Sequence, residues 1–436
     1  MRFTRPPRHH QYGTGQILVF LTFVLSSITS LRGAARAFKT LIALLPIPLP
    51  FVPCSWWAGR YWLLRLGLYK LTRPKTHADD WIWMADHTVQ VGPEKCLLIL
   101  GIRLSSLPAD TCHLTYEAME PIALCPVRTS NGDIVFQQLE AVVEKTGVPR
   151  AIVSDHGPDL LAGIQQFCTQ HPTTCAVYDI THKAASLVKA FLLYDDTWDR
   201  FCQFATRLKK QVTLTDLAVL APPAQRSKAR YMNVSRLGRW AGDVLAVLDE
   251  DRVLNKDAPI STHPNVSKVT GVEAFRDDIA VWNAVFEIVT MVEKAVRQYG
   301  FQPDCVEQLE AQVYAVEWLP HVSGFAEDLL QFVRDESAKA KPGERLPGSS
   351  EVIESVFGKL KTLEKGHANQ GITGFVLSAA AVIAPTTLDV VREAMETVST
   401  KDVQRWCRNT LGCSVQAQRK MIFRRTESSE TKMGST

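Results

Sequence analysis

The sequence predicts an α/β fold built on a mixed sheet, with a helical segment before the sheet and a helical insertion within it. Three observations lead to this prediction. Between residues 81 and 180 the patterns run strand, strand, strand, helix, strand, helix, strand. Helical patterns dominate before residue 79. Beyond His182 the strand patterns end, and helices with loops continue to about Lys341.

The strands are predicted from short apolar runs that have turn-forming residues on either side. The predicted strands and helices, in order, are WIWMADHTVQV at 81–91, KCLLILGIRL at 95–104, NGDIVF at 131–136, the helix QQLEAVVEKTG at 137–147, AIVSD at 151–155, the helix DLLAGIQQFCTQ at 159–170 and CAVYDI at 175–180.

The first 78 residues predict short helices around residues 16–45 and from Ser55 onward. In the second of these, an apolar stripe at helical spacing comprises Trp57, Tyr61, Leu64 and Leu68, and Arg60 and Arg65 lie off it. This pattern is typical of a helix-turn-helix module with Arg60 and Arg65 as DNA contacts. The alternative is an ordinary helical bundle with solvated arginines.

The charges are distributed unevenly along the chain. Residues 1–78 contain eleven Lys or Arg and no Asp or Glu, whereas the remaining residues carry 38 basic and 45 acidic side chains. Such a segment indicates a polyanionic partner, either nucleic acid or an anionic membrane. The apolar run at 17–31 is short for a membrane span, so we expect an uncleaved helix, with a signal or anchor as the alternative. Ten scattered cysteines without a CxxC pair favour a reduced cytoplasmic location.

The predicted helical insertion carries a second basic region. Between Arg207 and Arg239 there are eight Lys or Arg and a single acid, Asp216. The predicted DNA contacts here are Arg226, Lys228 and Arg230. They lie in a predicted loop that has little hydrophobic core to pack against. Trp240 is a candidate for stacking on an unpaired base, although a core position is the commoner role of a tryptophan.

Two aspartates fall in the predicted strands. Asp86 lies inside the first strand pattern, because apolar residues continue past it, and Asp155 ends the fourth. If these strands are neighbours, two buried carboxylates repel unless a cation bridges them. Oxygen ligands without thiolates favour Mg²⁺ or Mn²⁺, and the arrangement suits two-metal phosphoryl transfer. Alternatively, Asp-His-Gly-Pro at 155–158 is simply a good turn.

These residues resemble a known superfamily. The order of elements, with DHT in the first strand and SDHGPDL after the fourth, is similar to the RNase H-like fold of DDE transposases and retroviral integrases. IESVFGKLK at 353–361 resembles the insertion-sequence motif in which six residues separate Glu from Lys, as they do between Glu354 and Lys361. The family's upstream Tyr and Arg are replaced by Pro347 and Ser350, which leaves Glu351 as a rival third acid. His156 stands where the family often has Asn.

The resemblance implies roles for these residues. Asp86, Asp155 and Glu354 would be catalytic and would hold two Mg²⁺ ions, and Lys361 would reach a DNA phosphate. Water would cut at the element's end, and the freed 3′ hydroxyl would attack target DNA. His87, His156 and His182 are possible accessory groups, although such histidines are more often structural.

The expected organisation has five segments. They are a helix-turn-helix-like DNA-binding segment at 1–78, the first part of an RNase H-like core at 79–190, the helical insertion at 191–345, the second part of the core at 346–412 and a disordered basic tail at 413–436. We expect a DNA-bound, nucleoid-associated homo-oligomer, as a dimer. The alternatives are a nuclease that does not join ends, an inactive DNA-binding regulator and a membrane-tethered protein.

Overall fold

The computed structural model describes residues 4–44, 51–89, 95–193, 195–225, 231, 234–254, 266–364, 374–411 and 423. The chain divides into two compact units, the first formed by 1–107, 114–177 and 350–436 and the second by 108–113 and 178–349. The segment predicted at 1–78 and most of that predicted at 346–412, from residue 350 on, therefore lie with the sheet in the first unit. The second unit contains the predicted insertion and begins earlier than residue 191.

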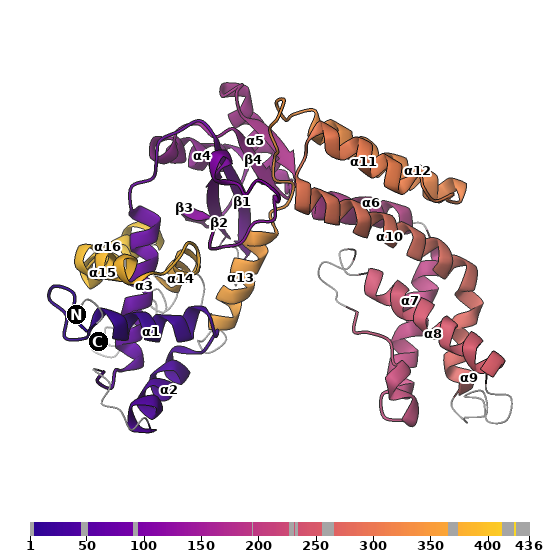
Figure 1. Cartoon of the computed structure of the whole chain (residues 1–436), viewed down its shortest axis with the longest axis horizontal. Coiled ribbons are helices and arrows are strands. Elements are labelled where there is room, and N and C mark those ends of the chain that lie inside the picture. The colour runs from indigo at the N-terminus through magenta and orange to yellow at the C-terminus, as the bar shows by residue number, and fades with distance from the viewer. Residues whose placement is uncertain are drawn as a thin grey trace, which may run out of the picture. The chain divides into compact units, whose positions relative to one another are not determined.

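A five-stranded mixed sheet forms the centre of the first unit (Figure 1). Its strands are β1 Trp81–Val89, β2 Lys95–Arg103, β3 Glu120–Val127, β4 Ala151–Ser154 and β5 Cys175–Tyr178. Their spatial order is β3-β2-β1-β4-β5, in which β2 pairs antiparallel with β1 and β3, and β4 pairs parallel with β1. This topology confirms the predicted α/β fold with an RNase H-like mixed sheet.

Helices α4, Gly132–Thr146, and α5, Pro158–Gln170, cover one face of this sheet. Their apolar stripes meet alternate residues of β1, among them Trp81 and Trp83, in one buried cluster. The two helices approach closely where Gly132 and Gly163 meet, since a Cβ on Gly163 would collide with Val135. The other face of β1 carries Asp86, in the same alternation as Ile82 and Met84.

The third predicted strand was wrong. NGDIVF begins helix α4, with the Asn131 side chain accepting the Ile134 N–H at the N-cap. The third strand is instead EPIALCPV, which contains Pro121 and Pro126. Two prolines argue against a central strand, but β3 lies at the sheet edge, where proline is tolerated.

Most of the remaining helices of the first unit pack around one of them, α3. These remaining helices are α1 Thr14–Leu25, α2 Leu31–Leu44, α3 Trp56–Thr72, α13 Glu351–Glu364, α14 Leu377–Val382, α15 Leu388–Thr397 and α16 Thr400–Leu411. Helix α3 contacts α1, α2, α14, α15, α16 and β3. From Trp62 to Leu68 every residue of α3 is buried. This burial disagrees with a recognition helix, which needs an open face for the DNA groove. No helix in the described ranges is long and apolar enough to cross a membrane.

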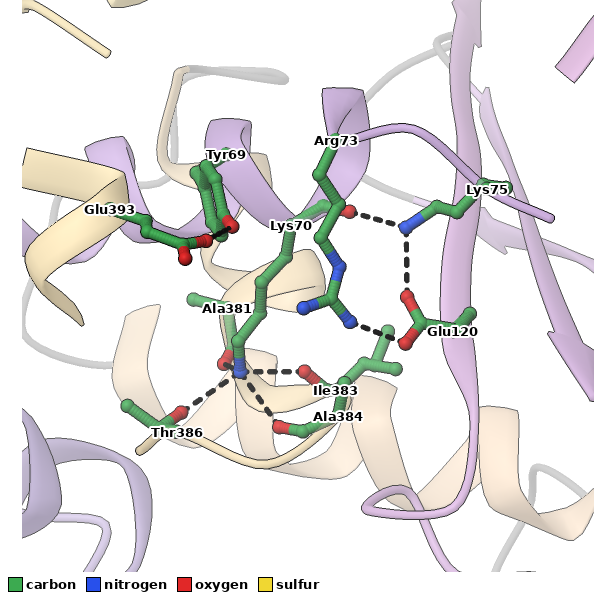
Figure 2. A network of polar contacts seen from close by, with 10 residues as sticks. All are labelled: Tyr69, Lys70, Arg73, Lys75, Glu120, Ala381, Ile383, Ala384, Thr386 and Glu393. Carbon is green, nitrogen blue, oxygen red and sulfur yellow. Dashed lines mark hydrogen bonds and ion pairs between the residues drawn. The ribbon is translucent and has the colours of Figure 1, made fainter. Parts of the chain in front are cut away.

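Lys70 lies fully buried near the end of α3 (Figure 2). Its ammonium donates to the backbone carbonyls of Ala381, Ile383 and Ala384 at 2.7–3.0 Å and to the Thr386 hydroxyl at 2.9 Å. Cations near a helix C-terminus satisfy carbonyls that lack intrahelical partners. Lys70 therefore fixes the turn after α14 to α3.

The second unit is helical in its described part. Its helices are α6 Ile180–Leu192, α7 Asp196–Val212, α8 Ser235–Leu254, α9 Val266–Val269, α10 Arg276–Tyr299, α11 Pro303–Val313 and α12 Pro320–Ser337. Aromatic rings fill its core, with Trp198 edge-on to Trp282 at a centroid distance of 4.8 Å. The all-helical character predicted for the insertion agrees with these helices.

Candidate active site

Asp86 lies in β1, and Asp155 directly follows β4, the parallel neighbour of β1. The paired positions are Ile82–Ala151, Trp83–Ile152 and Met84–Val153. Asp86 and Asp155 each lie two residues beyond the last of these pairs, and strand alternation puts both on the same side of the sheet. That side is opposite to the one that α4 and α5 cover. Both side chains are half-buried.

The turn after β4 orients Asp155. The Gly157 N–H donates to Asp155 Oδ1 at 2.9 Å, which closes an Asx turn. His156, between them, has φ +55°, in the left-handed region. Outside glycine, Asn, Asp and His are the residues that tolerate this region best. The backbone thus explains why His156 can replace the asparagine of the related motif.

A polar network that the sequence did not reveal lies beside this turn. Asp159, in the first turn of α5, accepts from Lys95 Nζ at 3.0 Å and lies 3.7 Å from His87 Nδ1. The other ring nitrogen of His87 is 3.4 Å from the Ser130 hydroxyl. Burial alone would raise the pKa of Asp159, but hydrogen bonds from Ser130 and Lys95 outweigh it and lower the pKa to about 2.

The electrostatic state of this network follows from burial. Burial lowers the pKa of His87, and the nearby Asp159 only partly opposes that effect. His87 is therefore neutral at neutral pH, and Asp159 is a carboxylate. The sole sequence signal for Asp159 was an acid in the first turn of a helix that begins with proline, where acids are generally favoured.

Helix α13 carries the predicted third acid. Its buried stripe consists of Val352, Ile353, Val356, Phe357, Leu360 and Leu363, and the helix contacts β1 and α14. Glu354 and Lys361 are exposed and share the opposite face, as does the rival Glu351 one turn earlier. In the described ranges, no three His, Cys, Asp or Glu side chains lie close enough together to hold a metal ion. The fit to a hard cation is therefore partial: Asp86 and Asp155 suit it, and Glu354 is not gathered with them.

Gly358 offers a test of the exposed face of α13. It stands between Glu354 and Lys361, and a Cβ there would meet nothing within 4 Å. Since glycine destabilises a helix interior by about 0.5–1 kcal/mol relative to alanine, Gly358→Ala should raise the free energy of unfolding by that amount. Urea denaturation measures it. Gly67→Ala is the matched control and should destabilise, because its Cβ would collide with the Leu377 carbonyl. A Gly358→Ala variant no more stable than the parent would contradict an open face.

The residues predicted to contact DNA differ in their burial. Arg65 is buried, and its guanidinium donates to the backbone carbonyls of Met395 and Val398. That burial disagrees with a phosphate contact. Arg60 is half-buried against Trp57 and Tyr61. Arg226, Lys228 and Arg230 lie outside the described residues, as does the predicted tail apart from Phe423.

The accessory candidates in the second unit have structural partners. Trp240 Nε1 donates to the Leu220 carbonyl at 3.0 Å, and its ring stacks on Phe201. The His182 N–H donates to the Asp179 carboxylate, which caps α6. The contacts of Trp240 agree with the structural alternative that the sequence left open for it, whereas the His182 contact involves only its backbone.

Comparisons with known proteins find similarity at the level of structure. No family model matches the sequence. No curated protein matches it either. Among solved structures, the chain is similar to the Drosophila P element transposase strand transfer complex, with 13% identity, coverage of 91% of this chain and 94% of that chain, and a TM-score of 0.40. A similarity with so low an identity and TM-score says nothing about chemistry, so the function is argued from the residues described above.

Proposed function

We propose that this protein is a DDE transposase of the insertion-sequence type, which cuts DNA at the ends of a mobile element and joins them to target DNA. The observation that carries the proposal is the pair Asp86 and Asp155. The parallel pairing of β1 with β4 ends two residues before each of them, and strand alternation puts both on the sheet face opposite to α4 and α5. Two carboxylates so placed favour a divalent cation over mutual repulsion.

Each of these residues would have a distinct role. Asp86 and Asp155 would hold Mg²⁺ or Mn²⁺, with the third carboxylate supplied from α13 by Glu354, or by Glu351 on the same face. When bound, two such ions supply charge stabilisation at the attacking and leaving oxygens of a phosphodiester. The Asx turn at 155–157 would keep the Asp155 carboxylate aimed, and Lys361 would bind a DNA phosphate two helical turns from Glu354.

The network around Asp159 would support this pair. His87 directly follows Asp86, and its ring is held between Asp159 and Ser130. The His87 N–H also donates to Asp86 Oδ1 at 2.6 Å. Locking the His87 ring therefore limits how β1 can turn Asp86. The DNA that the protein binds would be the element's terminal repeats and a target duplex, and a homo-oligomer would bind both.

A strand-transfer assay tests the function. We expect the full chain to nick and join labelled DNA carrying the element's ends with Mg²⁺ or Mn²⁺, and the Asp86→Asn variant to do neither. Asp133→Asn, an exposed acid in α4, is the matched control and should act like the parent. Glu354→Gln and Glu351→Gln then identify the third acid, because only its replacement should abolish both steps.

Each other outcome points to a rival. Cutting without joining would indicate a nuclease. DNA binding without cleavage, with Mg²⁺ and with Mn²⁺, would indicate an inactive DNA-binding regulator. Activity of Asp86→Asn equal to that of the parent would refute the carboxylate pair.

A further inference from the structure

A partly exposed column of aromatic rings and guanidinium groups lies where α3 begins. Trp56 and Trp57 stack with ring centroids 4.5 Å apart and planes at 25°. Tyr61 lies at 6.4 Å from Trp57 with nearly parallel rings. Arg60 lies over both Trp57 and Tyr61, at 5.7 and 5.9 Å from their centroids. Arg32 of α2 lies 5.0 Å over the Trp56 ring. We call these five residues the aromatic column.

The column is not part of the hydrophobic core. Trp57 is 52% exposed, although helical spacing had placed it on the apolar stripe of α3. Apart from Gly59, the buried residues of α3 begin farther along, at Trp62. A large ring left half in water loses the free energy that its burial would contribute, of about 25 cal/mol per Å². Its exposed face is therefore available to a partner.

A basic stripe on α2 extends from the column. Arg32, Arg36 and Lys39 are exposed and recur at helical spacing on one face. No acid occurs anywhere in residues 1–78 to neutralise them. Arg32 belongs to both features, so the stacked rings and the unopposed charges form one continuous surface within the first unit.

This surface favours nucleic acid over a membrane. An interfacial helix would insert an apolar face into lipid. Three apolar residues of α2, Leu31, Ala34 and Phe38, are instead buried within the protein, although Leu44 at the C-terminal end of the helix is 76% exposed. The face of α2 that carries Arg32, Arg36 and Lys39 presents charge to solvent, beside the rings at the start of α3. A positively charged track beside stacked aromatic side chains is the arrangement that binds single strands, with bases on the rings and phosphates on the cations.

We propose that the aromatic column and the basic stripe of α2 form a binding site for single-stranded nucleic acid, with an unpaired base stacking on Trp57 and the phosphates following Arg32, Arg36 and Lys39. This assigns to the N-terminal segment a partner that differs from the duplex expected of a recognition helix. The inference stands apart from the transposase proposal, since it requires no cleavage and no metal.

Fluorescence anisotropy with the full chain and a labelled oligothymidine tests the site, without divalent metal. We expect the parent to bind the oligothymidine more tightly than a duplex of the same length. Trp57→Ala should weaken this binding about tenfold, as the loss of one base–aromatic stack does, and Trp57→Phe should recover most of it. Arg32→Gln should weaken binding and flatten its salt dependence, whereas Lys401→Gln, an exposed lysine of α16, should change neither.

Three results would overturn the proposal. The first is unchanged oligothymidine affinity in Trp57→Ala and Arg32→Gln, both of which should keep the parent's circular dichroism spectrum. The second is a clear preference for the duplex. The third is binding to vesicles of phosphatidylcholine and phosphatidylglycerol that Trp57→Ala abolishes while oligothymidine is not bound. Loss of strand transfer in Asp86→Asn with normal oligothymidine binding would show that the two proposals are independent.

Discussion

Replacing Asp155 by asparagine is expected to lower metal-dependent DNA cleavage by at least about 100-fold, because even the outer partners of metal ligands are typically worth 10- to 100-fold. The amide has the shape of the carboxylate but lacks its charge. It keeps an oxygen that can accept the Gly157 N–H, which now donates to Asp155 Oδ1 at 2.9 Å. The turn should therefore survive while the cation loses a ligand.

Alanine at the same position separates the two roles of Asp155. Asp155→Ala loses the side-chain acceptor as well as the charge, and should lower the free energy of unfolding by about 1 kcal/mol. Asp155→Asn should leave it nearly unchanged. If Asp155 were only a turn residue, asparagine would be as active as the parent. Rates of cleavage and urea unfolding of the two variants distinguish these cases, and an active Asp155→Asn would refute the metal role.

The sheet was largely predictable because its strands are short apolar runs between turn residues. The exception, β3, was missed since its prolines are read as breakers until one knows that the strand lies at the edge. Helix α3 was misjudged for a related reason. Its arginines and lysine indicated a solvated face, yet Arg65 and Lys70 are buried on backbone carbonyls from residues more than 300 positions later. Such partners leave no local trace in the sequence.

In the candidate site, too, some residues could be predicted from the sequence and others could not. Asp86 and Asp155 could be paired in advance, because the order of strands decides which ends become neighbours. Asp159 could not, because Lys95, which fixes its charge, is 64 positions away. Whether Glu354 approaches the pair depends on how α13 packs on β1, and helical spacing defines only which face it occupies.

The buried Lys70 should make the stability of the protein depend on pH. Burial lowers its pKa from 10.5 to about 7, and the cations of Arg73 and Lys75 add to this effect while Glu120 opposes it. Figure 2 shows that Arg73 and Lys75 are themselves held by the Glu120 carboxylate, which leaves the Lys70 ammonium on neutral oxygens. Between about pH 7 and pH 10 the unfolded chain thus binds a proton at this lysine that the folded chain has released.

The sign follows from that difference. The free energy of unfolding should rise with pH in this window, by up to about 1.4 kcal/mol per pH unit, and the contribution should be flat below about pH 7, where both states are protonated. Tyr69 and Cys96 act in the opposite direction at higher pH, because burial raises their pKa values in the folded state. Those terms are the same in a variant that changes only Lys70.

Lys70→Met isolates the effect, since methionine keeps most of the length of the side chain without a titrating group. Subtracting its urea-unfolding free energies from those of the parent, at a series of pH values, should leave a difference that rises between about pH 7 and pH 9. Lys401→Met, on the exposed surface of α16, should leave none. The absolute stability of Lys70→Met depends on two opposing terms, the relief of a buried charge and the loss of a donor to three carbonyls. The slope contains only the first of these, so parallel curves for parent and Lys70→Met would show that Lys70 stays protonated and that the carbonyls alone stabilise its charge.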